Sequence, residues 1–191
     1  MRIQELIAEV KTTLVETFTE VDAWFEKPIS LKDYRPLDNG WTIQQILEHI
    51  SLTNYFLLEL IDKGALKAKR NLHNFNLEEA LKNFSFEKEK LDEIGIHKSF
   101  DWVRPDHMEP TGEMRSEEAR VLVSEQKNRC FEQLANMPNG EGIAHKTTMS
   151  VNNLGKINVY EYIYFLAKHA QRHITQMRKN EAEYRKENSS T

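Results

Sequence analysis

The chain has 191 residues, 39% of them hydrophobic and 29% charged, which is enough for one well-filled core and does not require a second domain. Its 26 basic and 30 acidic residues give a formal net charge of −4. This composition provides no overall positive field for nucleic acid or an anionic membrane, so we expect neither as a partner. The single cysteine, Cys130, excludes an internal disulfide, and we expect a protein of the reducing cytoplasm.

Two segments in the first third of the chain have the pattern of long amphipathic helices. The first stops before Pro28 and carries charges throughout, so we expect neither a signal peptide nor a membrane span there. Its apolar residues recur every three or four positions: Ile3, Ile7, Val10, Leu14, Phe18, Val21 and Phe25. The second opens at "NGWTIQQ", where Thr42 and Gln45 have the spacing of a capping box. We predict that it ends near Lys63, with Gly64 as a left-handed C-cap.

Two further long helices are predicted in the second half of the chain. One begins near Ser116 and ends before Pro138. The other begins at Asn158, a cap residue that has Glu161 at the capping-box position. Four amphipathic helices of this length predict an all-α fold, a four-helix bundle.

Long connections separate the second helix from the third and the third from the fourth. Residues 64–115 are too many for a simple loop, and we predict within them one short extra helix that begins at Asn76, followed by an irregular crossing over one end of the bundle. Residues 138–157 are rich in Gly and Asn and are expected to form a long loop with room for a short strand pair. We assign residues 1–185 to a single domain and residues 186–191 to a charged tail.

Three histidines have the spacing of inward-facing residues on two of these helices. His169 and His173 are four residues apart, so both rings lie on one face of the last helix, and His49 follows the core spacing of the second helix. Spacing leaves two explanations open. Either three neutral imidazoles meet across the core and bind a divalent metal with an open position, or they are core histidines satisfied by hydrogen bonds. The other histidines lie in polar or irregular segments and are expected to be exposed: His73, His97, His107 and His145. Of these, His107 and His145 can lie over the end of the bundle where a substrate enters.

The two segments that carry these histidines resemble the signature helices of the DinB-like (YfiT-like) superfamily. They are "NGWTIQQILEHISLTNYFLLELI" and "LGKINVYEYIYFLAKHAQRHITQM". In the first, a Trp and a capping hydroxyl precede a helix with one histidine, and in the second HxxxH is followed by a Gln. The resemblance implies an up-down-down-up four-helix bundle with a divalent metal ion, commonly zinc or nickel, held by His49, His169 and His173. It also implies that relatives with an assigned activity are often thiol transferases that use bacillithiol, mycothiol or glutathione.

These features predict a metal-dependent enzyme for a small molecule, most directly a thiol S-transferase in which the metal-bound thiolate of a low-molecular-weight thiol attacks an electrophile. The alternatives are a hydrolase that uses metal-bound water, and a non-catalytic bundle that binds a metal or ligand and pairs as a homodimer through an exposed helix face. A protease of the HExxH type is not expected, because "HAQRH" has no glutamate.

Three further residues are expected near the metal or a bound ligand. These are Trp41, Gln45 and Gln176. For Gln45 a capping role is the simpler explanation. Cys130 is expected to be a small buried residue and not a nucleophile, since no neighbouring motif activates it.

Overall fold

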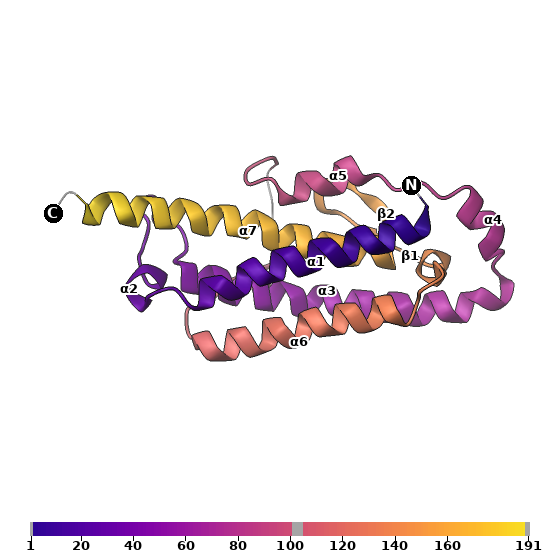
Figure 1. Cartoon of the computed structure of the whole chain (residues 1–191), viewed down its shortest axis with the longest axis horizontal. Coiled ribbons are helices and arrows are strands. Elements are labelled where there is room, and N and C mark those ends of the chain that lie inside the picture. The colour runs from indigo at the N-terminus through magenta and orange to yellow at the C-terminus, as the bar shows by residue number, and fades with distance from the viewer. Residues whose placement is uncertain (1, 101–104, 190–191) are drawn as a thin grey trace.

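The structure, a computed structural model, describes residues 2–100 and 105–189, and four long helices make up most of it (Figure 1). They are α1 (Ile3–Phe25), α3 (Ile43–Asn71), α6 (Ser116–Ala135) and α7 (Val159–Asn188). The connections hold three short helices, α2 (Ile29–Lys32), α4 (Leu77–Lys82) and α5 (Lys88–Asp92), and two strands, β1 (Lys146–Met149) and β2 (Gly155–Asn158). They also hold five 3-10 turns, η1 (Leu72–Asn74), η2 (Glu93–Gly95), η3 (Asp106–Met108), η4 (Glu141–Ala144) and η5 (Val151–Asn153). The described chain is mostly helical, as predicted, and no helix in it is both long and apolar enough to cross a membrane.

Capping boxes start both helices that carry the histidines, as the sequence predicts. At the start of α3, Thr42 Oγ1 accepts from the backbone N–H of Gln45 at 3.2 Å, and the Gln45 side chain accepts from the backbone N–H of Thr42 at 3.1 Å. At the start of α7, the Asn158 side chain accepts from the N–H of Glu161 at 3.2 Å, and the Glu161 carboxylate accepts from the N–H of Asn158 at 2.7 Å. These bonds satisfy donors that the first helical turn leaves open, so each helix begins at a defined residue.

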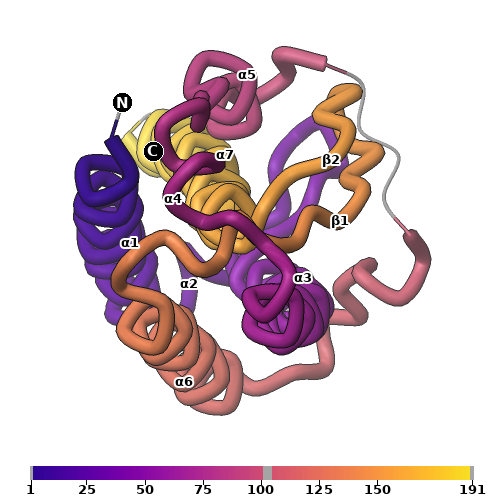
Figure 2. The backbone as a smooth tube through the Cα atoms, turned by 90° about the vertical axis from the view of Figure 1, so that its right-hand side faces the viewer, coloured from indigo at the N-terminus to yellow at the C-terminus, as the bar shows by residue number. Residues whose placement is uncertain are grey.

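The four long helices pack in a ring in which α1 and α3 each contact both α6 and α7 (Figure 2). Helix α1 runs parallel to α7, because residues later in the first are paired with residues later in the second: Glu20 with Arg178, and Lys27 with Glu181. In the same way α3 runs parallel to α6, with Ser51 bonded to Gln126 and Asp62 to Gln133. The two pairs run in opposite directions, because the Trp41 carbonyl just before α3 accepts a hydrogen bond from Asn180, near the end of α7.

The first half of helix α7 is enclosed on several sides. The helix is contacted by α1 and α3, and also by α5, η2 and β2 (Figure 2). Every residue from Val159 to Ala170 except Lys168 is buried. Strand β1 pairs with β2 in antiparallel register, with Lys146 opposite Asn158, so the hairpin leads directly into α7. The first half of this helix therefore lies inside the protein, which is where a catalytic or ligand-binding side chain can be shielded from water.

The predicted end of the second helix at Gly64 is wrong. Helix α3 continues to Asn71, and Gly64 is a buried position in its interior. A Cβ atom at Gly64 would lie 3.4 Å from Cγ2 of Val159, so the glycine lies where α3 and the start of α7 approach closely. The residues that follow are good helix formers and include the buried Ala65 and Ala68, and their propensity outweighs the cost of one glycine.

The segment predicted as one short extra helix forms two. Its start is confirmed, because the Asn76 side chain accepts from the N–H of Glu79 at 3.1 Å. Helix α4 then ends where the Asn83 side chain donates to the Glu79 carbonyl at 3.2 Å, and Phe84 and Phe86 pack against the core in the gap before α5. The helix is interrupted where these two rings pack against the core. The periodicity of the sequence does not indicate this interruption. The strand pair expected in the next connection is confirmed as β1 and β2.

Candidate metal centre

Three histidine rings meet between α3 and α7. His49 lies in the second turn of α3, while His169 and His173 lie one turn apart in α7. The Nε2 atom of His169 is 3.3 Å from Nε2 of His49 and 3.1 Å from Nε2 of His173, and the possible ligand atoms of the three all lie within 4.8 Å of one another. Each residue is at most 8% exposed. The structure thus brings together the three histidines that the sequence singles out.

Hydrogen bonds at the outer ring nitrogens determine how two of the rings are protonated. His49 Nδ1 is 2.6 Å from the backbone carbonyl oxygen of Met108, and His173 Nδ1 is 3.0 Å from Oε1 of Gln176. A carbonyl oxygen can only accept, so each Nδ1 carries the proton and donates it. The Nε2 atom of each ring then presents its lone pair toward the other histidines, which is the orientation of a metal-binding imidazole.

The donor set fits a divalent transition metal. Imidazole nitrogens bind zinc at about 2.0–2.1 Å, so two of them in a tetrahedral site lie roughly 3.4 Å apart. The separations of 3.1 and 3.3 Å are close to this value. Lone pairs that point at a common centre repel each other unless a cation or a proton lies between them. Three imidazoles suit zinc, nickel, copper and iron alike, so the ligand set by itself does not select the metal.

Burial keeps the rings of α7 neutral. Desolvation in the core lowers the pKa of His169 well below 6.5, and the neighbouring His173 and His49 rings lower it further. Desolvation also lowers the pKa of His173 well below 6.5, with His49 adding to the effect. A neutral imidazole is the form that binds a metal, and no proton has to be displaced from it at neutral pH.

A cavity of about 700 Å³ opens onto the three rings. Besides the histidines it is lined by the segment before α3 (Asn39, Gly40, Trp41), by the connection between α5 and α6 (His97, Lys98, Phe100, Glu109) and by α7 (Arg172, Gln176). This volume is in the usual range for a site that holds a small molecule. The metal ligands come from long helices, whereas most of the wall comes from connections.

Trp41 forms the side of the cavity next to the histidines. Its ring centroid is 4.7 Å from that of His49 and 6.3 Å from that of His173. Its carbonyl accepts a hydrogen bond from Asn180 at 2.9 Å, which ties the segment before α3 to α7. The indole therefore covers two of the three rings.

Two cationic side chains also reach the cavity. Arg172 lies on α7 between the two histidines of that helix and is only 8% exposed. Its guanidinium lies 5.0 Å from the ring centroid of Phe100 and donates to the Ile96 carbonyl and to Ser99 Oγ. Lys98 is exposed at the rim. These contacts give the cavity positive groups beside an aromatic face, with Glu109 as its acidic lining residue.

Of the three residues predicted near the metal or a bound ligand, the structure places two at the cavity and one away from it. Trp41 and Gln176 line the cavity, and Gln176 also bonds to a histidine of the centre. Gln45 is in the capping box of α3 and is not among the lining residues of this cavity. The buried Cys130 lies on α6, and burial raises the pKa of its thiol to about 12, which leaves it without the thiolate that a nucleophile requires.

Sequence reasoning missed several lining residues. His97 was expected to be exposed, but this is wrong, because the side chain is half-buried and lines the cavity. Of the other three, His73 and His107 are exposed as expected, whereas the expectation is also wrong for His145, which is half-buried. Neither His107 nor His145 is among the lining residues of the cavity. Arg172 had a usable signal, since it lies three residues after His169 on the same helix. The lining residues of the connection had none, because that segment has no periodicity.

Comparison with known proteins points to one family. A family model described as the DinB superfamily matches residues 12–177, a range that contains all three histidines and Trp41. No curated protein and no solved structure matches the chain. The match covers well over half of the sequence and extends from the first long helix to the last.

Proposed function

Since the chain belongs to the DinB superfamily, whose members are generally metal-dependent, we propose that it is a metal-dependent enzyme that acts on a small molecule. The ligands would be His49, His169 and His173, and the ion zinc or nickel. The observation that carries this proposal is the convergence of three buried ring nitrogens on the floor of a cavity of small-molecule size.

The residues around the histidines support this function by holding and shielding them. A divalent ion held by three neutral imidazoles keeps its full charge and lowers the pKa of a thiol or water that binds beside it. The Met108 carbonyl and the Gln176 side chain fix the two ring orientations. Trp41 covers the rings of His49 and His173 and limits the access of bulk water.

We propose thiol S-transfer as the reaction. The thiol of a low-molecular-weight co-substrate loses its proton, its sulfur forms a bond to an electrophilic carbon, and the leaving group departs with the electron pair of the broken bond. The proposal follows the resemblance given above, and the one cysteine of the chain is buried and cannot itself be the nucleophile. The sulfur nucleophile therefore has to enter the cavity as part of a second small molecule.

The cavity wall favours a substrate with a flat apolar part and an acidic group. Trp41 and Phe100 offer aromatic faces, and Lys98 and Arg172 offer positive charge. Glu109 is the acidic lining residue, and its negative charge disfavours an anion next to it. A small aromatic or unsaturated acid satisfies both kinds of lining group.

We also propose that the fold is the four-helix bundle that the resemblance implies. The ring of contacts among the four long helices supports it. Two parallel pairs that run in opposite directions have the up-down-down-up order of such a bundle.

The test is elemental analysis of untagged protein, for the wild type and for His49→Ala, His169→Ala and His173→Ala. We expect about one ion per chain in the wild type and a loss of most of it in each variant, because each removes one of three ligands. His73→Ala is the matched control, since this ring is exposed and is not among the lining residues of the cavity. Wild-type protein that takes up neither zinc nor nickel would overturn the proposal.

The same preparations test the reaction. A panel of electrophiles is offered with and without a low-molecular-weight thiol, and turnover that requires the thiol supports transfer. Turnover with water alone would show a hydrolase. A full complement of metal without any turnover would show a non-catalytic binding protein.

A further inference from the structure

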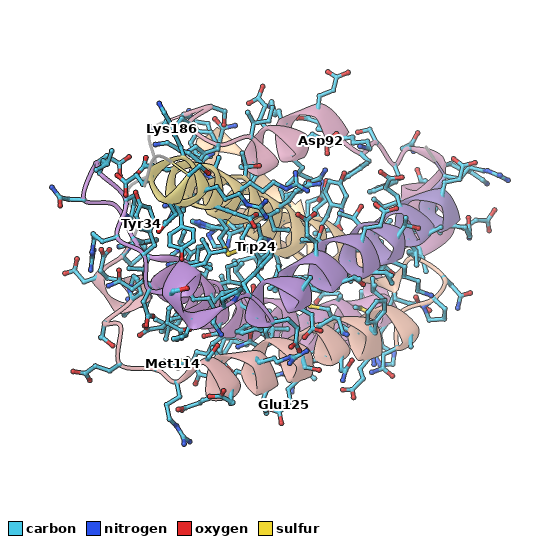
Figure 3. The ribbon with its side chains drawn as sticks, turned by 60° about the vertical axis from the view of Figure 1, so that its left-hand side comes forward. Trp24, Tyr34, Asp92, Met114, Glu125 and Lys186 are labelled. Atoms are coloured by element: carbon cyan, nitrogen blue, oxygen red, sulfur yellow. The ribbon has the colours of Figure 1, made fainter. Side chains whose placement is uncertain are left out.

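Part of the connection between α5 and α6 crosses the first half of α3 before it reaches α6. We call residues 108–114 of this connection the strap. Its bonds to α3 are Met108 to His49, Thr111 and Gly112 to Glu48, and Met114 to Gln44 and Ser51. Figure 3 labels Met114 at the end of the strap, beside the start of α6. The strap thus joins a segment without periodicity to the helix that carries the first histidine.

Glu48 is the main anchor of the strap. Its side chain is buried, at 2% exposure. Oε1 accepts from the backbone N–H of Thr111 at 3.0 Å and from its hydroxyl at 2.9 Å, and Oε2 accepts from the N–H of Gly112 at 2.8 Å. A carboxylate only accepts, and three neutral donors occupy both of its oxygens. Because a buried carboxylate is costly without such bonds, this turn of the strap is fixed to Glu48.

The backbone of the strap is shaped for this contact. Gly112 has a φ of +81°, a conformation that glycine adopts without the cost that a side chain brings. A Cβ atom at this position would lie 3.4 Å from Nε2 of Gln45, so the turn lies directly on the surface of α3. In this conformation the N–H of Gly112 donates to the Glu48 carboxylate.

The strap is bonded to two adjacent residues of α3 whose side chains point in different directions. Successive residues of a helix are rotated by about 100°, so Glu48 faces the strap while His49 faces the other two histidines. Four residues before Gly112, the Met108 carbonyl lies 2.6 Å from His49 Nδ1. The position of that carbonyl therefore depends on where the turn is held.

We propose that Glu48 is a positioning residue for the candidate metal centre. Its carboxylate holds the turn at Thr111 and Gly112, the turn holds the Met108 carbonyl, and the carbonyl keeps the proton of His49 on Nδ1 so that Nε2 faces the centre. The inference rests on the proposed function in one respect, that His49 is a metal ligand. The protonation of His49 in metal-free protein tests it apart from any metal.

The first experiment is nitrogen NMR of metal-free, histidine-labelled protein. In the wild type we expect His49 to appear as the form protonated on Nδ1. In Glu48→Gln we expect a mixture of both neutral forms, because the amide replaces one accepting oxygen of the carboxylate by an NH₂ group, which cannot accept the N–H of Thr111 or Gly112. Met108→Leu should keep the wild-type signal, since it keeps the carbonyl.

The second experiment measures zinc affinity by competition with a chelator. Glu48→Gln should bind zinc about 10–100-fold more weakly, the usual effect of losing an outer partner of a metal-binding histidine. Gln44→Met is the matched control, because it removes the bond from Gln44 to the Met114 carbonyl and leaves the turn bound to Glu48 and Met114 bound to Ser51. It should change the affinity by no more than about twofold.

Several results would overturn the inference. One is a Glu48→Gln protein whose His49 signal and zinc affinity equal those of the wild type, and another is a Gln44→Met control that loses as much as Glu48→Gln. Should Glu48→Gln not fold, Thr111→Val removes one donor at an exposed position and must shift the His49 signal in the same direction, or the inference fails. Wild-type protein that binds no zinc contradicts the proposed function, and the His49 signal then still decides the role of Glu48.

Discussion

Each histidine ring of the candidate centre has an inner and an outer nitrogen in different surroundings. For His49 and His173 the outer nitrogen donates to one oxygen atom, a backbone carbonyl in the first case and the Gln176 amide in the second. The inner nitrogens of both rings lie next to Nε2 of His169. A single oxygen atom therefore favours the ring form in which Nε2 faces the centre, and substitutions that leave all three histidines intact can still weaken the site.

Lys98 is the residue with which the charge of the cavity can be tested. We expect Lys98→Gln to weaken the binding of benzoate, a flat carboxylate, by roughly two- to fivefold, because an exposed ion pair contributes about 0.2–1 kcal/mol. Neutral benzamide should bind the variant as it binds the wild type. Isothermal calorimetry on metal-free protein measures both.

Lys179→Gln is the control for this charge change. Lys179 pairs with Asp38 at 3.0 Å and is not among the lining residues of the cavity. Benzoate affinity should be unchanged in it. An equal loss in both lysine variants, or a loss for benzamide as well, would show that Lys98 does not contact the carboxylate.

The sequence was sufficient to find the histidines but not the residues around them. Periodicity places His49, His169 and His173 on inward faces because each lies on a regular helix. The Met108 carbonyl and the Glu48 anchor depend on a strap that contacts α3 across about sixty residues of chain. No local pattern specifies such a contact, since it is made by backbone groups that every sequence has.

Among the helices, the close approach of α3 to α7 has a measurable consequence. Gly64→Ala should stabilise the protein by about 0.5–1 kcal/mol, because alanine has the higher helix propensity and the added carbon would meet Val159 at an ordinary contact distance of 3.4 Å. Thermal unfolding should show a higher midpoint.

A larger side chain at the same position should have the opposite effect. Gly64→Leu forces additional atoms between two packed helices, and overpacking of this kind costs about 1–3 kcal/mol. If Gly64→Ala also lowered the midpoint, the contact between the helices would have to be tighter than the structure shows.

Element ends were predicted well where side chains cap a helix and poorly where packing decides. The starts of α3 and α7 follow from the chemistry of Thr42 and Asn158. The continuation of α3 beyond Gly64 does not, since glycine is a common C-cap and only the neighbouring helix explains its presence here. The division into α4 and α5 likewise depends on aromatic rings drawn to a core that the local sequence does not describe.

Over the whole molecule, α7 joins the other long helices to short elements of the connections. It contacts α1, α3, α5, η2 and β2. The contact with α5 includes a charged cluster around Asp92, which Figure 3 labels above α7. Asp92 accepts from Tyr164 Oη at 2.6 Å and from Lys88 Nζ at 2.7 Å, and pairs with Lys168 at 3.0 Å.

This cluster makes the stability of the protein depend on pH. Burial on its own would raise the pKa of Asp92, but hydrogen bonds from Lys88, Tyr164 and Lys168 outweigh it and lower the pKa below 3.8. A carboxyl whose pKa is lowered by folding stabilises the folded state above its unfolded pKa, and this contribution is lost as the pH falls through the folded value. At pH 7 we expect Asp92→Asn to cost roughly 1 kcal/mol, since the half-exposed pairs are partly screened.

Urea unfolding at pH 7 and at about pH 2 measures this effect. The difference between wild type and Asp92→Asn should shrink at the lower pH, because the Asp92 carboxyl loses its charge as the pH falls through its folded pKa. Asp33→Asn, an exposed position, serves as the control. A difference of the same size at both pH values would mean that Asp92 contributes by packing and not by charge.

The division of the cavity between helices and connections has a consequence for how such a protein can change. The histidines are built into α3 and α7, which contact each other and most of the other elements, while most of the wall belongs to the connections. Replacing residues 96–100 by a segment of different length and chemistry would change which molecules can enter the cavity. The three histidines would stay in place. The chain is therefore a scaffold on which new specificities can be selected from loop libraries, with the strap kept constant.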